Sequence, residues 1–264
     1  MKTVGLKLSN TMKILPQFVL YFLLLASLSP AKAQSDSEYP NRVIGDIGVG
    51  IYASKTNLQG QGTETSVLPY GFFDYQRFFM RIDTLGVKLF SAGYGHIELA
   101  GRVNADSQFI KINPSGNSIT KNTPAPIGFG SLQITPVGAF YLNAFHDFGS
   151  SQGNLLEGLY FAELSTKYFT IYPQAGIEYL SGKYANYYFG LSPAEAATLG
   201  SSSYTARATT NTMLGAMVEI PLSHHWILNV YGKHKWLGNE INGSPVLSQK
   251  HQDLFFMALA YRFK

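Results

Sequence analysis

The sequence contains no cysteine, and beyond its first 33 residues it has no long apolar run. An exported chain without cysteine cannot be held together as a disulfide scaffold. Without a further apolar run of about 20 residues, the rest of the chain cannot supply a membrane-spanning helix. The sequence is instead rich in Gly (26), Tyr (17) and Phe (18), at a mean hydropathy of zero. Such a composition is typical of a membrane β-barrel, in which only alternate residues meet lipid.

A basic surplus is also missing from most of the chain. The full sequence has 20 Lys plus Arg against 16 Asp plus Glu, but residues 1–33 hold four of the lysines and no acid. The remainder therefore has 16 of each sign. Nucleic-acid-binding proteins carry a basic surplus on one face, so nucleic acid is excluded as an expected partner.

The N-terminus has the pattern of a secretory signal peptide. Lys2, Lys7 and Lys13 precede an apolar run over residues 14–28, and Ala31-Lys32-Ala33 follows as a small-x-small cleavage site. The run is shorter than a spanning helix, and no cysteine follows the site, which excludes a lipoprotein. We expect a signal peptide over residues 1–33, cleavage between Ala33 and Gln34, and one domain over residues 34–264.

The last stretch of the chain, Leu254 to Lys264, alternates between two kinds of side chain. Successive residues of a strand point to opposite faces, and here one face is entirely apolar or aromatic. In a soluble protein such a terminal edge strand would promote aggregation, whereas the closing strand of a barrel in lipid requires it. The apolar face consists of Phe255, Met257, Leu259, Tyr261 and Phe263.

The segment from Trp226 to Trp236 favours the same interpretation. Its two tryptophans lie ten residues apart, hence on one face, and ten residues of strand span about 33 Å. A tilt of about 40° reduces this to about 25 Å along the membrane normal, the height of the apolar band between aromatic girdles. We expect Trp226 and Trp236, with Tyr261 and Phe263, to lie in those girdles.

The expected fold is an all-β antiparallel transmembrane β-barrel of the bacterial outer membrane, with 12 strands or, as the alternative, 10. Twelve result if residues 78–82, 85–90 and 204–210 form separate strands and residues 128–145 form one long strand, either straight or bent at Pro136. With 12 strands the long connection over 104–127 is extracellular and that over 181–203 periplasmic; with 10 the two exchange sides. Within the second connection, Ser192-Pro193 predicts a capped helical turn.

Charged residues at alternate positions of the expected strands predict a polar lumen. Both signs occur, which suits a small barrel filled by its own side chains better than a selective pore. A small-solute channel and a surface adhesin nevertheless remain alternative functions. The expected lumen charges are Asp46, Glu98, Arg102, Glu178, Glu219, Lys233 and Arg262.

The six histidines form no recognisable catalytic or metal-binding motif. No Gly-x-Ser-x-Gly and no His-Glu-x-x-His motif occurs. His224 and His225 lie together in an expected tight turn, where a solvated turn or an interfacial anchor is the simpler interpretation. We therefore predict no enzyme activity, no catalytic residues, no metal site and no cofactor.

Several short blocks resemble the MipA/OmpV family of outer-membrane proteins. The resemblance runs from about Gly45 to the C-terminus, with departures at Gly182, where members often carry a polar residue, and at the trailing Lys264. The blocks that carry it are Gly182–Gly190 (GKYANYYFG), Leu191–Ala196 (LSPAEA), Tyr204–Ala206, Leu68–Tyr70, Ser244–Val246 and Tyr261–Phe263.

This resemblance implies a scaffold of the murein-synthesising machinery. The relative that gives the family its name brings together a membrane-bound lytic transglycosylase and a bifunctional peptidoglycan synthase, so a murein hydrolase and a synthase are the implied partners. Outer-membrane lipids, lipopolysaccharide and the barrel assembly machinery are expected of any such barrel. Rigid aromatic side chains are typical interface anchors; the candidate partner contacts are Tyr184, Asn186, Tyr187, Tyr188 and Phe189. The alternative is that these rings pack across the mouth of the barrel.

Overall fold

The computed structural model describes residues 39–55, 58–60, 62–102 and 117–263. The predicted signal peptide with its Ala33–Gln34 cleavage site, most of the connection over 104–127, and Lys264 lie outside the described residues. Within the described part of the chain, no helix has both the length and the apolar character needed to cross a membrane.

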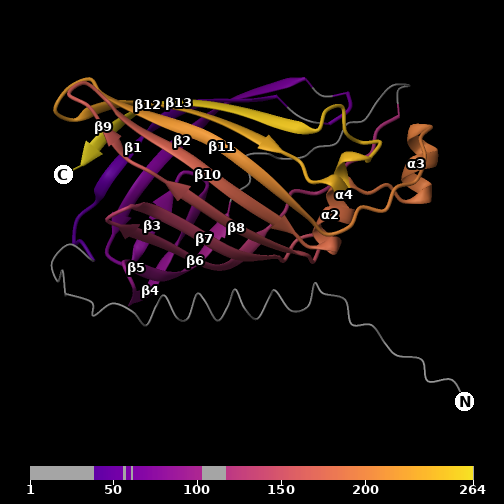
Figure 1. Cartoon of the computed structure of the whole chain (residues 1–264), viewed down its shortest axis with the longest axis horizontal. Coiled ribbons are helices and arrows are strands. Elements are labelled where there is room, and N and C mark those ends of the chain that lie inside the picture. The colour runs from indigo at the N-terminus through magenta and orange to yellow at the C-terminus, as the bar shows by residue number, and fades with distance from the viewer. Residues whose placement is uncertain (1–38, 56–57, 61, 103–116, 264) are drawn as a thin grey trace, which may run out of the picture.

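The strands form one antiparallel sheet that closes on itself (Figure 1). Successive strands pair with each other, except that β8 and β9 both pair with β10, and β13 pairs with β1 to complete the circle. The strands are β1 (Ile44–Lys55), β2 (Thr63–Tyr75), β3 (Phe78–Arg81), β4 (Thr84–Ala92), β5 (Gly95–Arg102), β6 (Pro126–Thr135), β7 (Gly138–Asp147), β8 (Asn154–Phe161), β9 (Leu164–Ser165), β10 (Thr170–Leu180), β11 (Thr209–Pro221), β12 (Trp226–Trp236) and β13 (His251–Phe263).

The barrel wall has 12 strands, because β9 is the continuation of β8. Both pair with β10, and Phe161 opposite Gln174 stands in the same register as Leu164 opposite Ile171. The interruption lies opposite Pro173, which lacks an N–H to donate to the ladder. Ala162 still donates its N–H to the Pro173 carbonyl at 3.0 Å. The register is therefore continuous across the interruption.

The predicted total of 12 strands is confirmed, but two of the predicted strands were wrong. One of them is in fact two strands and the other is not a strand, so the total is unchanged. Residues 128–145 are not one bent strand; β6 and β7 form a hairpin whose turn contains Pro136, because proline is well suited to the first central position of a turn. Residues 204–210 are not a separate strand; Tyr204 makes an isolated bridge with Leu191, and Thr209 already belongs to β11.

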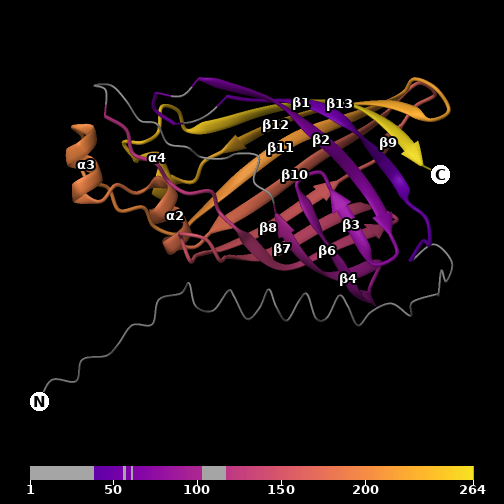
Figure 2. The ribbon, with the colours of Figure 1, turned by 180° about the vertical axis from the view of Figure 1, so that it is seen from behind.

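These two errors also reverse one prediction about the long connections. Both termini of the described barrel lie at one end, and the segments 117–125 and 181–208 both lie at the other (Figures 1 and 2). Short turns belong to the periplasmic end of such barrels and long loops to the extracellular end. The connection over 181–203 is therefore extracellular, not periplasmic, and lies on the same side as 117–125.

The alternation of each strand separates a lipid-facing from an inward-facing set of side chains. On β1, Ile47, Val49 and Ile51 are exposed, whereas Asp46 and Tyr52 are buried in the interior. On β13 the outward face predicted from the sequence is exposed at four of its five positions, while Phe256, Ala258 and Ala260 are buried. Gly50 lies beneath the Phe256 ring: a Cβ on it would stand 2.4 Å from a ring carbon. The core of this protein is thus the filled lumen.

The barrel wall is shorter at β3 than elsewhere, because this strand has only four residues. Beyond Gly71, whose carbonyl accepts the Ile82 N–H at 2.7 Å, the outer part of β2 pairs with β1 but not with β3. Pro69 lies two residues before Gly71, so its backbone faces the same unpaired side of β2. Proline has no N–H to leave unpaired there, and it is common on such strand edges. Gln76 and Ile82 are the first residues of two-residue turns and both have positive φ, 51° and 59°.

Candidate functional site: the outer mouth and the charged lumen

Three short helices lie at the extracellular end (Figure 1). They are α2 (Gly182–Phe189), α3 (Pro193–Leu199) and α4 (Asn239–Asn242). The sequence predicted a helical turn only at α3. There the Ser192 hydroxyl accepts the Glu195 N–H, and the Glu195 carboxylate accepts the Ser192 N–H at 2.9 Å, which completes a capping box.

Helix α2 is fastened to the end of β8. Ser181 donates its N–H to the Asn154 carbonyl at 2.9 Å, and Asn154 donates its N–H to the Ser181 hydroxyl at 2.8 Å. Gly153 allows this close approach, since a Cβ on it would lie 2.3 Å from the Tyr184 backbone nitrogen. The helix therefore sits directly across the mouth of the barrel.

The aromatic side chains of α2 close the mouth. The rings of Tyr184 and Tyr188 stand 4.7 Å apart, and Tyr187 meets Tyr188 edge-on at 4.9 Å. Tyr188 is 1% exposed, and its hydroxyl lies 3.3 Å from Asp147 Oδ2. Burial raises the pKa of Tyr188 well above its ordinary value, and the adjacent Tyr184 and Asp147 raise it further. The apolar cluster also includes Phe145, Leu155, Leu180, Leu237 and Ile241.

Asp147 ties three connections together beneath this cluster. Its Oδ1 accepts the backbone N–H of Ala125 at 2.8 Å and that of Gly149 at 2.9 Å. Its Oδ2 accepts the hydroxyl and the backbone N–H of Ser151, the latter at 3.2 Å, and lies within reach of Tyr188. One carboxylate thus holds the segment before β6, the β7–β8 turn and α2.

A second attachment joins α3 to the segment 117–125. The Lys121 ammonium bonds the Glu195 carboxylate and lies 5.3 Å from the centre of the Tyr187 ring. Burial alone would raise the pKa of Glu195, but hydrogen bonds from Lys121 and from the Ser192 backbone and hydroxyl hold that pKa below its ordinary value of 4.5. The carboxylate therefore stays ionised, and the attachment intact, at neutral pH.

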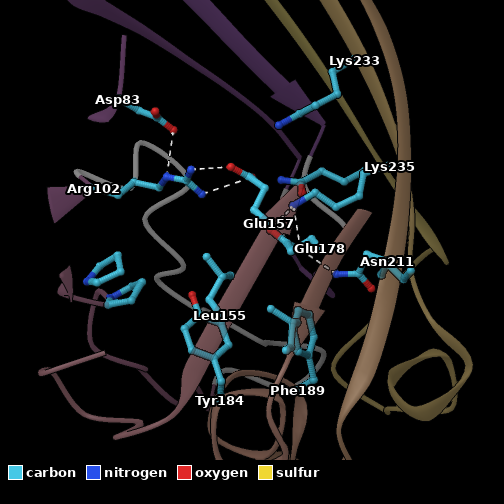
Figure 3. Close-up of a pocket in the computed structure, with 15 residues that line it drawn as sticks. Asp83, Arg102, Leu155, Glu157, Glu178, Tyr184, Phe189, Asn211, Lys233 and Lys235 are labelled. Carbon is cyan, nitrogen blue, oxygen red and sulfur yellow. Dashed lines mark hydrogen bonds and ion pairs between the residues drawn. The ribbon is translucent and has the colours of Figure 1, made fainter. Parts of the chain in front are cut away.

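Beneath the mouth lies a cavity of about 100 Å³ lined by charged side chains (Figure 3). The Arg102 guanidinium forms two hydrogen bonds with Glu157, at 2.6 and 3.2 Å, and its Nε stands 3.7 Å from Asp83. On the opposite wall Lys235 lies 3.3 Å from both oxygens of Glu178. The inner face of the barrel thus holds paired charges, and the apolar cluster covers them.

The periplasmic half of the lumen has its own ion-pair network. Arg262 bonds Asp46 at 2.7 and 2.8 Å and Glu219 at two distances of 2.7 Å. Between the two networks, Asn229 donates to the Tyr70 hydroxyl at 3.0 Å. Apart from the cavity, ion pairs and hydrogen bonds between the protein's own side chains cross the described lumen.

The structure places the predicted site residues in two groups. Of the candidate partner contacts, Tyr184, Tyr188 and Phe189 are buried, Tyr187 is half-buried and Asn186 is exposed. The block lies at the extracellular end of the barrel, opposite the end that carries both termini. That these residues contact some partner stays a prediction. The predicted girdle residues point outward, and Trp226 meets Tyr261 edge-on at 5.6 Å.

The sequence predicted all three members of the Arg262 network, Asp46, Glu219 and Arg262, to face the lumen. Of the two pairs below the mouth it predicted only Arg102 and Glu178, and neither Glu157 nor the anchor Asp147 was singled out. Both lie on inward positions of their strands, so alternation could have found them. Among the described residues, no group of three or more His, Asp or Glu side chains is placed to hold a metal ion.

A closed antiparallel barrel with an apolar outer surface, a charged interior and short turns at the end that carries both termini is an outer-membrane β-barrel. Comparison with known proteins narrows this class. Residues 47–263 match the family described as MltA-interacting protein MipA. The chain belongs to this family, as the resemblance predicted.

Several relatives carry outer-membrane names. The chain is 21% identical to the putative outer membrane protein YiaT of Escherichia coli (strain K12), over 82% of this chain and 90% of that protein. It is 26% identical to the outer membrane protein Omp26La of Vibrio anguillarum, over 81% of this chain and 85% of the relative. A 91-residue stretch, 34% of this chain and 35% of the relative, is 34% identical to OmpV of Vibrio cholerae. The predicted location in the outer membrane is thereby confirmed.

A solved structure also aligns with this chain. It is the outer membrane protein OprG from Pseudomonas aeruginosa, with 12% identity over 84% of this chain and 94% of that one. The TM-score is 0.24, which is too low for any conclusion about details of this barrel.

Proposed function

We propose that this barrel is a non-enzymatic outer-membrane scaffold that holds murein-processing enzymes at its periplasmic end. The description of its family names an interaction with MltA, and the sequence resemblance implies a lytic transglycosylase and a peptidoglycan synthase as partners. A filled lumen suits a scaffold better than a channel.

The observation that carries the proposal is the character of the periplasmic turns. Four of these turns present large, exposed apolar side chains, of which the most exposed on each turn are Tyr94 (53% exposed), Val137 (71%), Tyr168 (70%) and Leu222 (56%). Tyrosine is common at the membrane interface in any barrel, but valine and leucine are not girdle residues. Apolar side chains that are exposed together mark an interaction site, whereas isolated ones need no explanation; we propose that these four together form the surface that the partner contacts. We call these four residues the turn surface.

The test is a binding measurement with purified components. The wild-type barrel in detergent is immobilised, and the affinity of the lytic transglycosylase and the bifunctional synthase from the same genome is measured. The triple variant Val137→Ser, Tyr168→Ser and Leu222→Ser should bind at least about tenfold more weakly, because central apolar contacts are worth about 1–2 kcal/mol or more each.

The matched control is Phe148→Ser. Phe148 is 63% exposed, on the β7–β8 turn at the extracellular end, so its replacement should leave the affinity unchanged. Absence of binding to the wild-type barrel would refute the scaffold role. Equal binding by the triple variant would refute the turn surface as its contact.

A further inference from the structure

Two histidines share one carboxylate at the extracellular ends of β12 and β13, beside Trp236. His234 Nδ1 lies 2.5 Å from Asp253 Oδ1, and His251 Nε2 lies 3.7 Å from the other oxygen of the same carboxylate. The two imidazole rings stack, with their centres 5.1 Å apart and their planes 23° from parallel. We call His234, His251 and Asp253 the rim cluster.

The rim cluster stands at the base of the loop over residues 237–250. Trp236 pairs with His251 at the ends of the two strands, and the Leu237 N–H then donates to the Lys250 carbonyl at 3.0 Å. Leu237 itself belongs to the apolar cluster that covers the mouth. The strand ends that carry the rim cluster therefore hold part of this cover in place.

Few charges face the two rings. Among the described residues, Asp253 is the one carboxylate within 4 Å of either imidazole. On β1, Lys55 stands opposite Asp253 in the ladder, and such cross-strand neighbours share a face of the sheet. Lys250, which precedes His251, is exposed. The residues of β11 opposite Trp236 and His234 carry no charge; they are Thr212 and Leu214.

The number of protons on the rim cluster decides whether its charges attract or repel. Histidine changes its charge between about pH 5 and 8, and the two rings are 36% and 39% exposed, so protons of the medium reach them. A first proton makes one ring an imidazolium, whose charge the carboxylate balances through a charge-assisted hydrogen bond. A second proton stacks two positive rings on one carboxylate with Lys55 nearby, and like charges at this distance repel.

We propose that the rim cluster is a pH-sensitive latch at the cell surface. It holds the ends of β12 and β13 together while no more than one ring is charged, and it opens when both are charged. Acidification of the medium then loosens the base of the loop over residues 237–250 and its part of the mouth cover. The latch does not depend on the scaffold role, because it lies at the opposite end of the barrel from the turn surface.

The first measurement is a fluorescence titration of the full refolded barrel in detergent, at constant ionic strength and with a chelator present. The sequence has two tryptophans, so Trp226→Phe leaves Trp236 as the reporter. Its ring meets that of His234 at 4.4 Å between centres, and a charged imidazole quenches indole emission. Emission should fall as the pH is lowered from about 8 to 5, and His234→Asn should remove the change.

The second measurement is hydrogen exchange of residues 237–250, corrected for the intrinsic effect of pH. These amides should exchange at least about threefold faster at about pH 5.5 than at about pH 7.5, the scale of a weak charge interaction at a protein surface. His251→Asn keeps a polar side chain but cannot take up the second charge, so it should abolish this acid response.

The control is His146→Asn on β7, which should respond to acid as the wild type does. Emission of Trp236 that does not depend on His234 would overturn the proposal. So would loop exchange in the wild type that is unchanged by acid, or an undiminished acid response in the His251→Asn variant.

Discussion

Replacing Glu157 by glutamine tests whether the lumen is dry and filled or open to water. The Arg102 and Glu157 side chains are 9% and 8% exposed and share two hydrogen bonds. The glutamine variant keeps the shape of the side chain but removes the charge, and Asp83 at 3.7 Å is then the nearest carboxylate to the guanidinium.

The expected cost depends on how well water reaches the pair. Removing one partner of a buried ion pair costs about 3–5 kcal/mol, because the other charge is left buried without compensation. An exposed pair is worth only about 0–1 kcal/mol. Since glutamine can still accept one hydrogen bond and Asp83 is close, we expect a loss of about 2–3 kcal/mol. At about 1.4 kcal/mol per factor of ten, this is roughly a 30- to 150-fold decrease of the folding constant.

The assay is urea unfolding of the refolded barrel in detergent, followed by the shift in gel mobility between folded and heated forms. The double variant Arg102→Met, Glu157→Leu should recover most of the lost stability, because neither buried charge of the pair remains and Asp83, at 46% exposure, is solvated. Lys167→Met, at an exposed turn, is the control and should change stability by less than about 0.5 kcal/mol. A loss below about 1 kcal/mol for Glu157→Gln would refute the filled lumen and favour the channel alternative.

Three further predictions concern the turns and the mouth. Gln76→Gly should stabilise the barrel by about 0.5–1 kcal/mol in the same urea assay, because Gln76 has a φ of 51°; a loss would contradict this. Gly153→Ala should loosen α2 and cost about 1–3 kcal/mol, because the new Cβ meets the Tyr184 backbone; unchanged hydrogen exchange of α2 would contradict it. The attachment of Lys121 to Glu195 should weaken as pH falls below 4.5, because the folded-state pKa of Glu195 is lowered and its stabilisation is lost on protonation. Proteolysis near α3 should then increase in the wild type, and Glu195→Gln should remove this pH dependence.

Much of the barrel could be predicted because strand alternation encodes it locally. The outward and inward faces of β1, β10 and β13 follow from single stretches of sequence, since lipid and lumen demand opposite side chains. The hairpin at Pro136 was missed because alternation continues on both sides of the turn and no Gly or Asn stands at its two central positions.

The mouth could not be predicted from local patterns. Helix α2 is rich in tyrosine and phenylalanine, which have only moderate helix propensity, so its helical form depends on packing against Phe145, Leu155 and Leu180. The lumen pairs are also set by tertiary structure, because Arg102 and Glu157 are separated by 55 residues. Alternation shows that a charge faces inward but not which charge it meets.

The most direct test of the scaffold role is photo-crosslinking in living cells from the periplasmic turns. A photoreactive side chain is placed at residue 137 or 168, with residue 148 at the extracellular end as the control position. The proposal predicts that positions 137 and 168 capture a murein hydrolase or synthase and that position 148 does not. Capture of such an enzyme from position 148 would contradict the proposal. So would the absence of capture from all three positions in cells whose barrel is folded in the outer membrane.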